Sequence, residues 1–255
     1  MRMLALPAAL LLGAALYTLL PQAEEWLAAG FRALLEKIRQ LFTTKKGATD
    51  ERSALIVYFL AIAAAATILC AIHPIVAAIV MTPLFSGFSP LLACSNTKQE
   101  LDSGKFSKNI PEYERRVIAA CEPLGEAFAH RVAAPMLLCA LGMLLHLGAA
   151  PGWLYAALCA NEDFLSAAEK VLSPIRRASE SAVNAILLLC AGLVGRNPLR
   201  VGGEGTKEKL LHILSLKGEI DHAPIAGDIT QAIFLCCLCT GLLCAALTFI
   251  GVFIM

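Results

Sequence analysis

Two glutamates and a histidine recur at every fourth position in the stretch CEPLGEAFAHRVAAP, which covers residues 121–135. If this stretch is helical, Glu122, Glu126 and His130 share one face. Carboxylates one turn apart repel each other, and the cost rises near lipid, so we expect a cation beside them. Paired carboxylate oxygens also suit Mg²⁺, which keeps several waters and bridges to substrate phosphates. The spacing thus favours a metal site at Glu122 and Glu126.

A simpler interpretation of the same charges stays open. Proline fits the first position of a helix, so a helix could begin at Pro123. Glu122 and Glu126 would then face the positive end of that helix. In this interpretation they are solvated charges at a membrane boundary and carry no chemistry.

The segments around this stretch are apolar enough for a membrane protein. The 255-residue chain is 58% hydrophobic, against about 45–50% in soluble domains. A spanning helix needs roughly 20 apolar residues, and long runs without period-two alternation favour helices over a barrel. The net charge of +1 gives no argument for nucleic acid as a partner. Four runs contain no Asp, Glu, Lys or Arg: residues 3–20, 53–93, 132–161 and 229–255.

We therefore predict an all-α protein, a polytopic transmembrane helical bundle of five or six membrane segments with an interfacial amphipathic helix. It forms a single integral membrane domain over residues 1–255, and its first helix is retained rather than cleaved as a signal peptide. The predicted parts are a first helix (3–20), an amphipathic helix (24–42), a helical hairpin turning at His73–Pro74 (53–93), the site-bearing helices (112–195), a cytoplasmic loop (196–228) and a last helix (229–255).

Two connections in this scheme are less regular. Residues 94–116 are polar and contain Gly104 and Pro111, which predicts a loop. The run 132–161 can either cross the bilayer completely or form a re-entrant hairpin at GAAPGW, residues 148–153. The distribution of Lys and Arg does not decide between these two topologies.

One known family shares several of these features. The chain resembles the core of the cobalamin-biosynthesis membrane proteins called CobD or CbiB, in the stretch YERRVIAACEPLGEAFAHRVAAPMLLCALG and again in PGWLYAALCANEDF. Glu122 and Glu126 match the family's glutamate pair, and Ala134–Pro135 match its "AP" at the start of an apolar helix. Tyr155 fits the tyrosine of a second family motif. The resemblance is firm over residues 112–164 and looser over residues 53–255.

The resemblance implies a multi-pass protein of the bacterial inner membrane that performs ATP-dependent amide formation. A carboxylate of adenosylcobyric acid, the corrinoid substrate, becomes an acyl phosphate, and the amine of aminopropanol or its phosphate attacks it. Mg²⁺ and ATP would be the cofactors, with Mg²⁺ at Glu122 and Glu126. The candidate catalytic residues are Glu126, His130, Arg131 and Glu162, and the candidate residues for binding the nucleotide are Arg176 and Arg177.

Several positions depart from the family pattern. Ala127 and His130 replace an Asn and an Asp of the glutamate motif, while Ala156 and Cys159 replace a Lys and an Asn of the second motif. Alanine and cysteine cannot supply the lost polar ligands. The alternative is therefore a non-catalytic, AmpE-like membrane signalling or interaction protein, with lipid around it and a second copy or another membrane protein as its partner.

Overall fold

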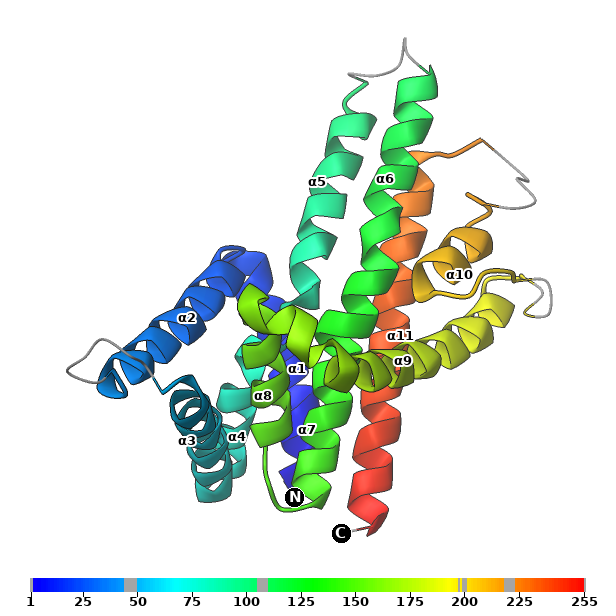
Figure 1. The fold of residues 1–255 in the computed structure, drawn as a ribbon. Helices are drawn as coiled ribbons and strands as arrows, with labels where there is room; N and C mark the ends of the chain where they lie inside the picture. The colour runs from blue at the N-terminus through cyan, green and yellow to red at the C-terminus, as the bar shows by residue number, and fades with distance from the viewer. Residues whose placement is uncertain are drawn as a thin grey trace. The chain divides into compact units, whose positions relative to one another are not determined.

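The computed structural model describes residues 2–43, 50–104, 110–196, 198, 201–217 and 223–254, without the side chains of residues 2 and 162–167. Within these ranges every regular element is a helix, which confirms the predicted all-α class (Figure 1). The helices are α1 (Ala5–Leu19), α2 (Ala23–Leu41), α3 (Glu51–Ile72), α4 (Pro74–Met81), α5 (Ser89–Asp102), α6 (Ile110–Phe128), a π-helix (Ala129–Ala133), α7 (Ala134–Leu144), α8 (Ala150–Ala160), α9 (Glu162–Leu193), α10 (Thr206–Ile213) and α11 (Ala226–Ile254).

In the part of the chain that the structure describes, three helices are long and apolar enough to cross a membrane: α3, the continuous run from α6 to α7, and α11. Two pairs of shorter helices, α1 with α2 and α4 with α5, raise the number to five if each bent pair is one span. Five spans is the lower of the two numbers predicted from the sequence, five or six. Large apolar side chains on α3 and α11 are exposed, as expected where a helix faces lipid: Ile56, Leu60, Ile68, Phe249 and Phe253.

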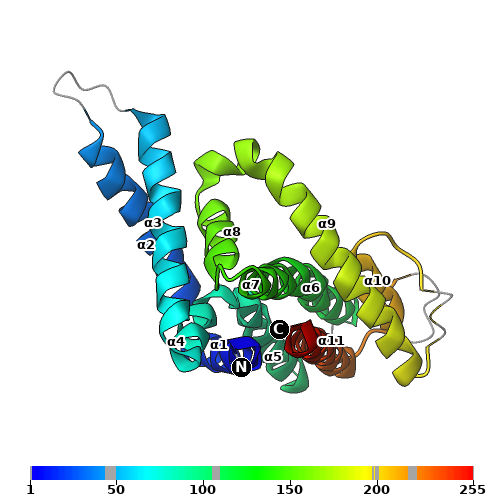
Figure 2. The same ribbon diagram turned by 90° about the horizontal axis from the view of Figure 1, so that it is seen from below.

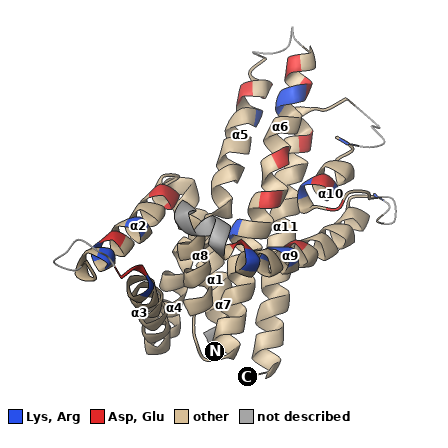
Figure 3. Cartoon of the chain, in the orientation of Figure 1, with Lys and Arg blue, Asp and Glu red and all other residues tan. Residues whose placement is uncertain are grey.

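Charged residues are unevenly distributed over the helices. In Figure 3 they colour α2, α5, α6, α9 and α10, whereas α7 and most of α3 and α11 are uncharged. Because lipid offers no compensation for a charge, this distribution fits a membrane protein.

The chain divides into two compact units, which are described separately. The first unit comprises residues 1–86, 135–174 and 247–255, and the second comprises residues 87–134 and 175–246. The predicted boundaries of a single domain stay a prediction.

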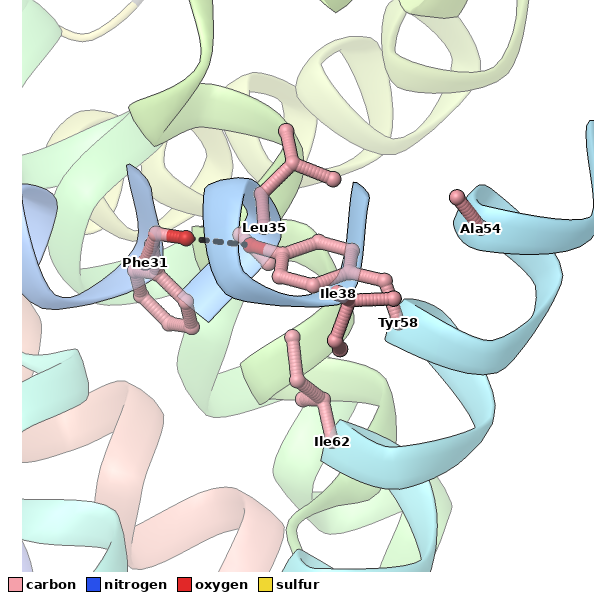
Figure 4. Packing of buried hydrophobic residues seen from close by; sticks show 7 residues of the cluster. Phe31, Leu35, Ile38, Ala54, Tyr58 and Ile62 are labelled. Carbon is pink, nitrogen blue, oxygen red and sulfur yellow. Dashed lines mark hydrogen bonds between the residues drawn. The ribbon is translucent and has the colours of Figure 1, made fainter. Parts of the chain in front are cut away.

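The core of the first unit lies where α2, α3 and α8 meet. The apolar face predicted for residues 24–42 is real: Phe31, Leu35 and Ile38 of α2 are buried against Tyr58 and Ala157 of α3 and α8. The Tyr58 hydroxyl donates a hydrogen bond of 3.4 Å to the carbonyl oxygen of Phe31 (Figure 4). From below, α2 and α3 lie side by side (Figure 2). The amphipathic helix is thus fixed to the bundle by its apolar face.

The predicted turn at His73–Pro74 is confirmed. α3 ends at Ile72, His73 is extended, and its Nδ1 accepts a hydrogen bond of 3.2 Å from the backbone nitrogen of Ile75. Pro74 starts α4 because a first helical position needs no backbone donor. The second arm is shorter than predicted, since 3-10 turns at Thr82–Leu84 and Ser86–Phe88 follow α4.

The polar stretch predicted as a loop over residues 94–116 is largely helical instead. α5 continues to Asp102, and α6 begins at Ile110. Lys98 and Asp102 are four residues apart and form an ion pair of 2.8 Å, an arrangement that stabilises an exposed helix. Polarity alone therefore gave the wrong state for residues 94–102.

The run 132–161 contains a helical hairpin, in which a turn at residues 145–149 joins α7 to α8. The re-entrant topology stays a prediction. α7 ends at Leu144 and α8 returns over 11 residues, about 16 Å of helix and too short to cross a bilayer. Gly142 lies so close to Gly148 that an added Cβ would sit 2.2 Å from the Gly148 carbonyl oxygen. The glycines permit this tight turn.

In the second unit, α5, α10 and the start of α11 surround α6. The Cys94 thiol of α5 donates to the carbonyl oxygen of Ala120 at 2.8 Å. The backbone nitrogen of Ala226 donates to the Tyr113 hydroxyl at 3.0 Å, so α11 begins beside α6. The last helix thus starts slightly earlier than the predicted residue 229.

Candidate functional site

The glutamates lie well inside a long helix. α6 begins at Ile110, so the interpretation in which Pro123 starts the helix is wrong. Pro123 instead occupies a helix interior, where it leaves one backbone carbonyl without its helical donor. Glu122 and Glu126 therefore do not lie at the positive end of a helix.

The predicted face changes between Glu126 and His130. Glu122 and Glu126 keep α-helical spacing, but His130 lies in the π-helix Ala129–Ala133. The wider π turn shifts the direction of side chains from one turn to the next, and such turns are frequent at functional sites. Glu126 is exposed, Glu122 is partly exposed, and His130 is largely covered.

Glu122 has a basic partner from α10. Lys207 Nζ lies 3.4 Å from Glu122 Oε1, with both side chains a little over 40% exposed. At this exposure the pair contributes at most about 1 kcal/mol to stability. Its importance is positional, since it brings a lysine to the first glutamate of the pair.

A close backbone approach holds that lysine in place. A Cβ on Gly125 would lie 3.0 Å from the Lys207 nitrogen and from the Thr206 carbonyl oxygen. Only glycine allows the two helices to meet so closely without a shift. Gly125 stands one turn from Glu122 on α6, so the start of α10 is set against the glutamate turn.

Further polar contacts join α10 to the residues before and after it. Lys217 Nζ lies 2.6 Å from Glu208 Oε1, and the Glu204 backbone nitrogen donates to Glu208 Oε2 at 3.2 Å. The hydrogen bond from Lys217 is the main cause that lowers the pKa of Glu208 below its ordinary value, and the Glu204 hydrogen bond adds to it. Lys209 also donates to the carbonyl oxygen of Gly203.

His130 has an acidic partner from α9. Its Nε2 lies 2.7 Å from Glu180 Oε1, and the two side chains are 21% and 33% exposed. A carboxylate at this distance fixes the orientation of the imidazole. This pairing is what a proton-transferring histidine requires.

The other predicted site residues are less concentrated. Arg131 is exposed on the π-helix, while Arg176 is partly buried and Arg177 exposed on α9. Glu162 opens α9 in the first unit, and its side chain lies outside the described residues. The residues of the second family motif, including buried Tyr155, also belong to the first unit.

The donor set suits a metal only in part. Among the described residues, no group of three or more His, Cys, Asp or Glu could hold an ion. Two carboxylates fit Mg²⁺ when phosphate oxygens and waters complete its shell. Lys207 already pairs with one of the two carboxylates, Glu122. Mg²⁺ could bind here only if Lys207 moved from Glu122 to a phosphate group. The Mg²⁺ site stays a prediction.

The sequence did not identify Lys207 or Glu180 as functional. Lys207 lies 85 residues from Glu122, and Glu180 lies 50 residues from His130. Contacts between residues so far apart leave no periodic pattern in the sequence. The Gly-rich segment RVGGEGTK was visible, but it matches no phosphate-binding motif and predicted only a turn.

Comparisons with protein-family models, with curated proteins and with solved structures found no match to this chain.

Proposed function

We propose that the chain is a divergent, CobD/CbiB-like synthase of the bacterial inner membrane that forms an amide on a corrinoid with ATP. Its site would be the polar side of α6 together with the start of α10. The resemblance supplies the reaction class, and the polar contacts of the second unit supply groups that can carry it out.

The observation that carries the proposal is the contact of Lys207 with Glu122 above Gly125. Phosphoryl transfer needs a cation on the transferring group and carboxylates for the metal. When bound, Mg-ATP would supply the phosphoryl group that turns the substrate carboxylate into an acyl phosphate. Lys207 would leave Glu122 and neutralise a phosphate, and Glu122 with Glu126 would hold the ion. A lysine that pairs with one of the two carboxylates at a half-exposed position suits this exchange of partners.

His130 and Glu180 fit the second half of the reaction. The attacking amine must lose a proton as its nitrogen bonds to the acyl carbon and the phosphate departs. His130 can accept that proton, and Glu180 Oε1 at 2.7 Å from its Nε2 orients the ring. The two ends of the α6 site would thus serve activation and attack, with Arg131 beside His130 as an exposed basic group.

A second candidate has its own supporting observation. Both Glu122 and His130 are engaged in ion pairs within the chain, and Ala127, Ala156 and Cys159 lack the family's polar groups. Such pairs also serve a purely structural role by joining α9 and α10 to α6. This arrangement favours a non-catalytic membrane interaction protein with another membrane protein or a second copy as its partner.

One assay separates the two candidates. Membranes that contain the chain are supplied with adenosylcobyric acid, aminopropanol phosphate, Mg²⁺ and ATP, and the amide is detected by its mass. The synthase forms product, and Glu126→Ala abolishes it at unchanged expression. Absence of product in wild-type membranes, with no binding of Mg-ATP, overturns the synthase and leaves the interaction protein.

A further inference from the structure

A small cavity lies in the first unit, at the end of α3 remote from its charged start. Its volume is about 20 Å³, close to what one water molecule or one ion occupies. Residues of α3, α4, α7 and the turn after α7 line it: Thr67, Cys70, Ala71, Ala77, Met81, Met143, His146 and Gly148.

Four of these residues can bind a metal, and three of them, one cysteine and two methionines, are soft ligands. Cys70, Met81 and Met143 are 5% or less exposed, and His146 closes the cavity from the exposed turn. A thiolate, two thioethers and an imidazole form a set that prefers Cu(I). The four side chains come from four separate segments, so the fold brings them to one cavity although nothing in their spacing predicts it.

The backbone near His146 adopts a conformation that ordinary residues avoid. His146 has φ of 60° and Gly148 has φ of 57°, in the left-handed region that costs most side chains energy. Hydrogen bonds secure this turn, from Leu147 nitrogen to the Gly142 carbonyl oxygen at 2.7 Å and from the Thr67 hydroxyl to the Leu147 carbonyl oxygen at 3.0 Å. A left-handed residue with a hydrogen bond of this kind is a common way to end a helix, and here it places His146 beside the cavity.

The close contact with Cys70 explains why the turn needs a glycine. A Cβ on Gly148 would lie 2.6 Å from the Cys70 Cβ and 3.3 Å from its Sγ. The turn therefore lies directly against the cysteine, and a larger residue at position 148 would push it away from the cavity.

Charge decides between metals. The lining contains no Asp, Glu, Lys or Arg, and a net charge in apolar surroundings is costly. One thiolate neutralises Cu⁺ completely but leaves Zn²⁺ with a positive charge. Binding forms one copper–thiolate bond and releases the thiol proton to solvent, while the two thioethers and the imidazole bind as neutral ligands.

We propose that Cys70, Met81, Met143 and His146 form a binding site for a single Cu⁺ ion. This site lies in the first unit and does not depend on the synthase proposal, whose polar pairs belong to the second unit.

The test is a Cu(I) titration of the full, detergent-purified, reduced chain against a chromophoric chelator without oxygen. We expect that the wild-type chain binds one Cu⁺ ion more tightly than any other. The affinity for this ion should be at least tenfold weaker in Cys70→Ala and in Met81→Leu. The matched controls Cys159→Ala and Met136→Leu change the same residue types in the same unit outside the cavity, and they retain wild-type affinity.

Two results would overturn the site. One is an unchanged tightest affinity in both cavity variants, which would assign the copper to other cysteines. The other comes from X-ray absorption of the one-to-one complex. A spectrum without thioether sulfur around copper would overturn the site, and so would a loss of sulfur scattering in Met136→Leu but not in Met81→Leu. Methionine-to-leucine changes conserve volume, so Met81→Leu keeps the fold and the comparison remains decisive.

Discussion

Lys207 of α10 reaches Glu122 of α6 across 85 residues of chain, and its Nζ lies 3.4 Å from the Glu122 carboxylate. The contact occurs beside Gly125, where the two backbones approach so closely that a side chain would not fit without a shift. This relationship links the acidic turn of the sequence to a basic group that its spacing does not reveal, and the following predictions begin from it.

Gly125→Ala should weaken the packing of α10 on α6. The added Cβ meets backbone atoms of Thr206 and Lys207 at 3.0 Å, and overpacking of this kind costs about 1–3 kcal/mol. The matched control is Gly30→Ala in α2, where a Cβ meets nothing within 4 Å and alanine should stabilise the helix by about 0.5–1 kcal/mol. Thermal unfolding in detergent measures both, and equal shifts would refute the close contact.

Leu35→Ala should destabilise the first unit. Leu35 is 3% exposed in the core between α2 and α3, and such a truncation costs about 2–5 kcal/mol. Its neighbour Leu34 is 38% exposed, so Leu34→Ala is the control and should change the unfolding midpoint little. If both variants unfold alike, α2 does not pack through the face described.

Glu208→Gln should remove a pH dependence from the segment before α10. Because the pKa of Glu208 is lowered by Lys217, the ion pair stabilises the segment above the carboxyl's unfolded pKa and is lost as pH falls through the lowered value. Hydrogen exchange of residues 203–209, corrected for intrinsic rates, should accelerate between about pH 6 and pH 3 in the wild type. The variant should show no such transition, and a transition of wild-type size there would contradict the pairing.

Lys207→Met should lower product formation about a hundredfold if the lysine neutralises the transferring phosphate, since loss of one preorganised cation or donor costs this order. Lys98→Met, which removes a lysine paired within α5, is the control and should retain activity. A loss that appears equally in both variants would point to general destabilisation. Substrate saturation curves for each variant distinguish binding from turnover.

The overall fold followed from the sequence because apolar runs and helical periodicity are local properties. The turn at His73–Pro74 and the apolar face of α2 follow directly from proline chemistry and from the spacing of Phe31, Leu35 and Ile38. The helical state of residues 94–102 was missed because its support comes from side-chain pairs and from packing on α6, which polarity does not report.

The candidate site could be predicted only in part. The glutamate pair and His130 are visible from their spacing, but the π-helix that displaces His130 depends on tertiary packing. Glu180 and Lys207 reach the site through the positions of α9 and α10, and no sequence separation fixes those positions. The ligands proposed for the cavity were likewise hidden, since they come from four separate segments of the chain.

The central claim is that the polar side of α6 performs chemistry, and the formation of the corrinoid amide by membranes tests it most directly. With adenosylcobyric acid, aminopropanol phosphate, Mg²⁺ and ATP, wild-type membranes should yield a product of the amide's mass, and Glu126→Ala membranes with equal protein should yield none. Equal product from both, or none from the wild type, would contradict the claim.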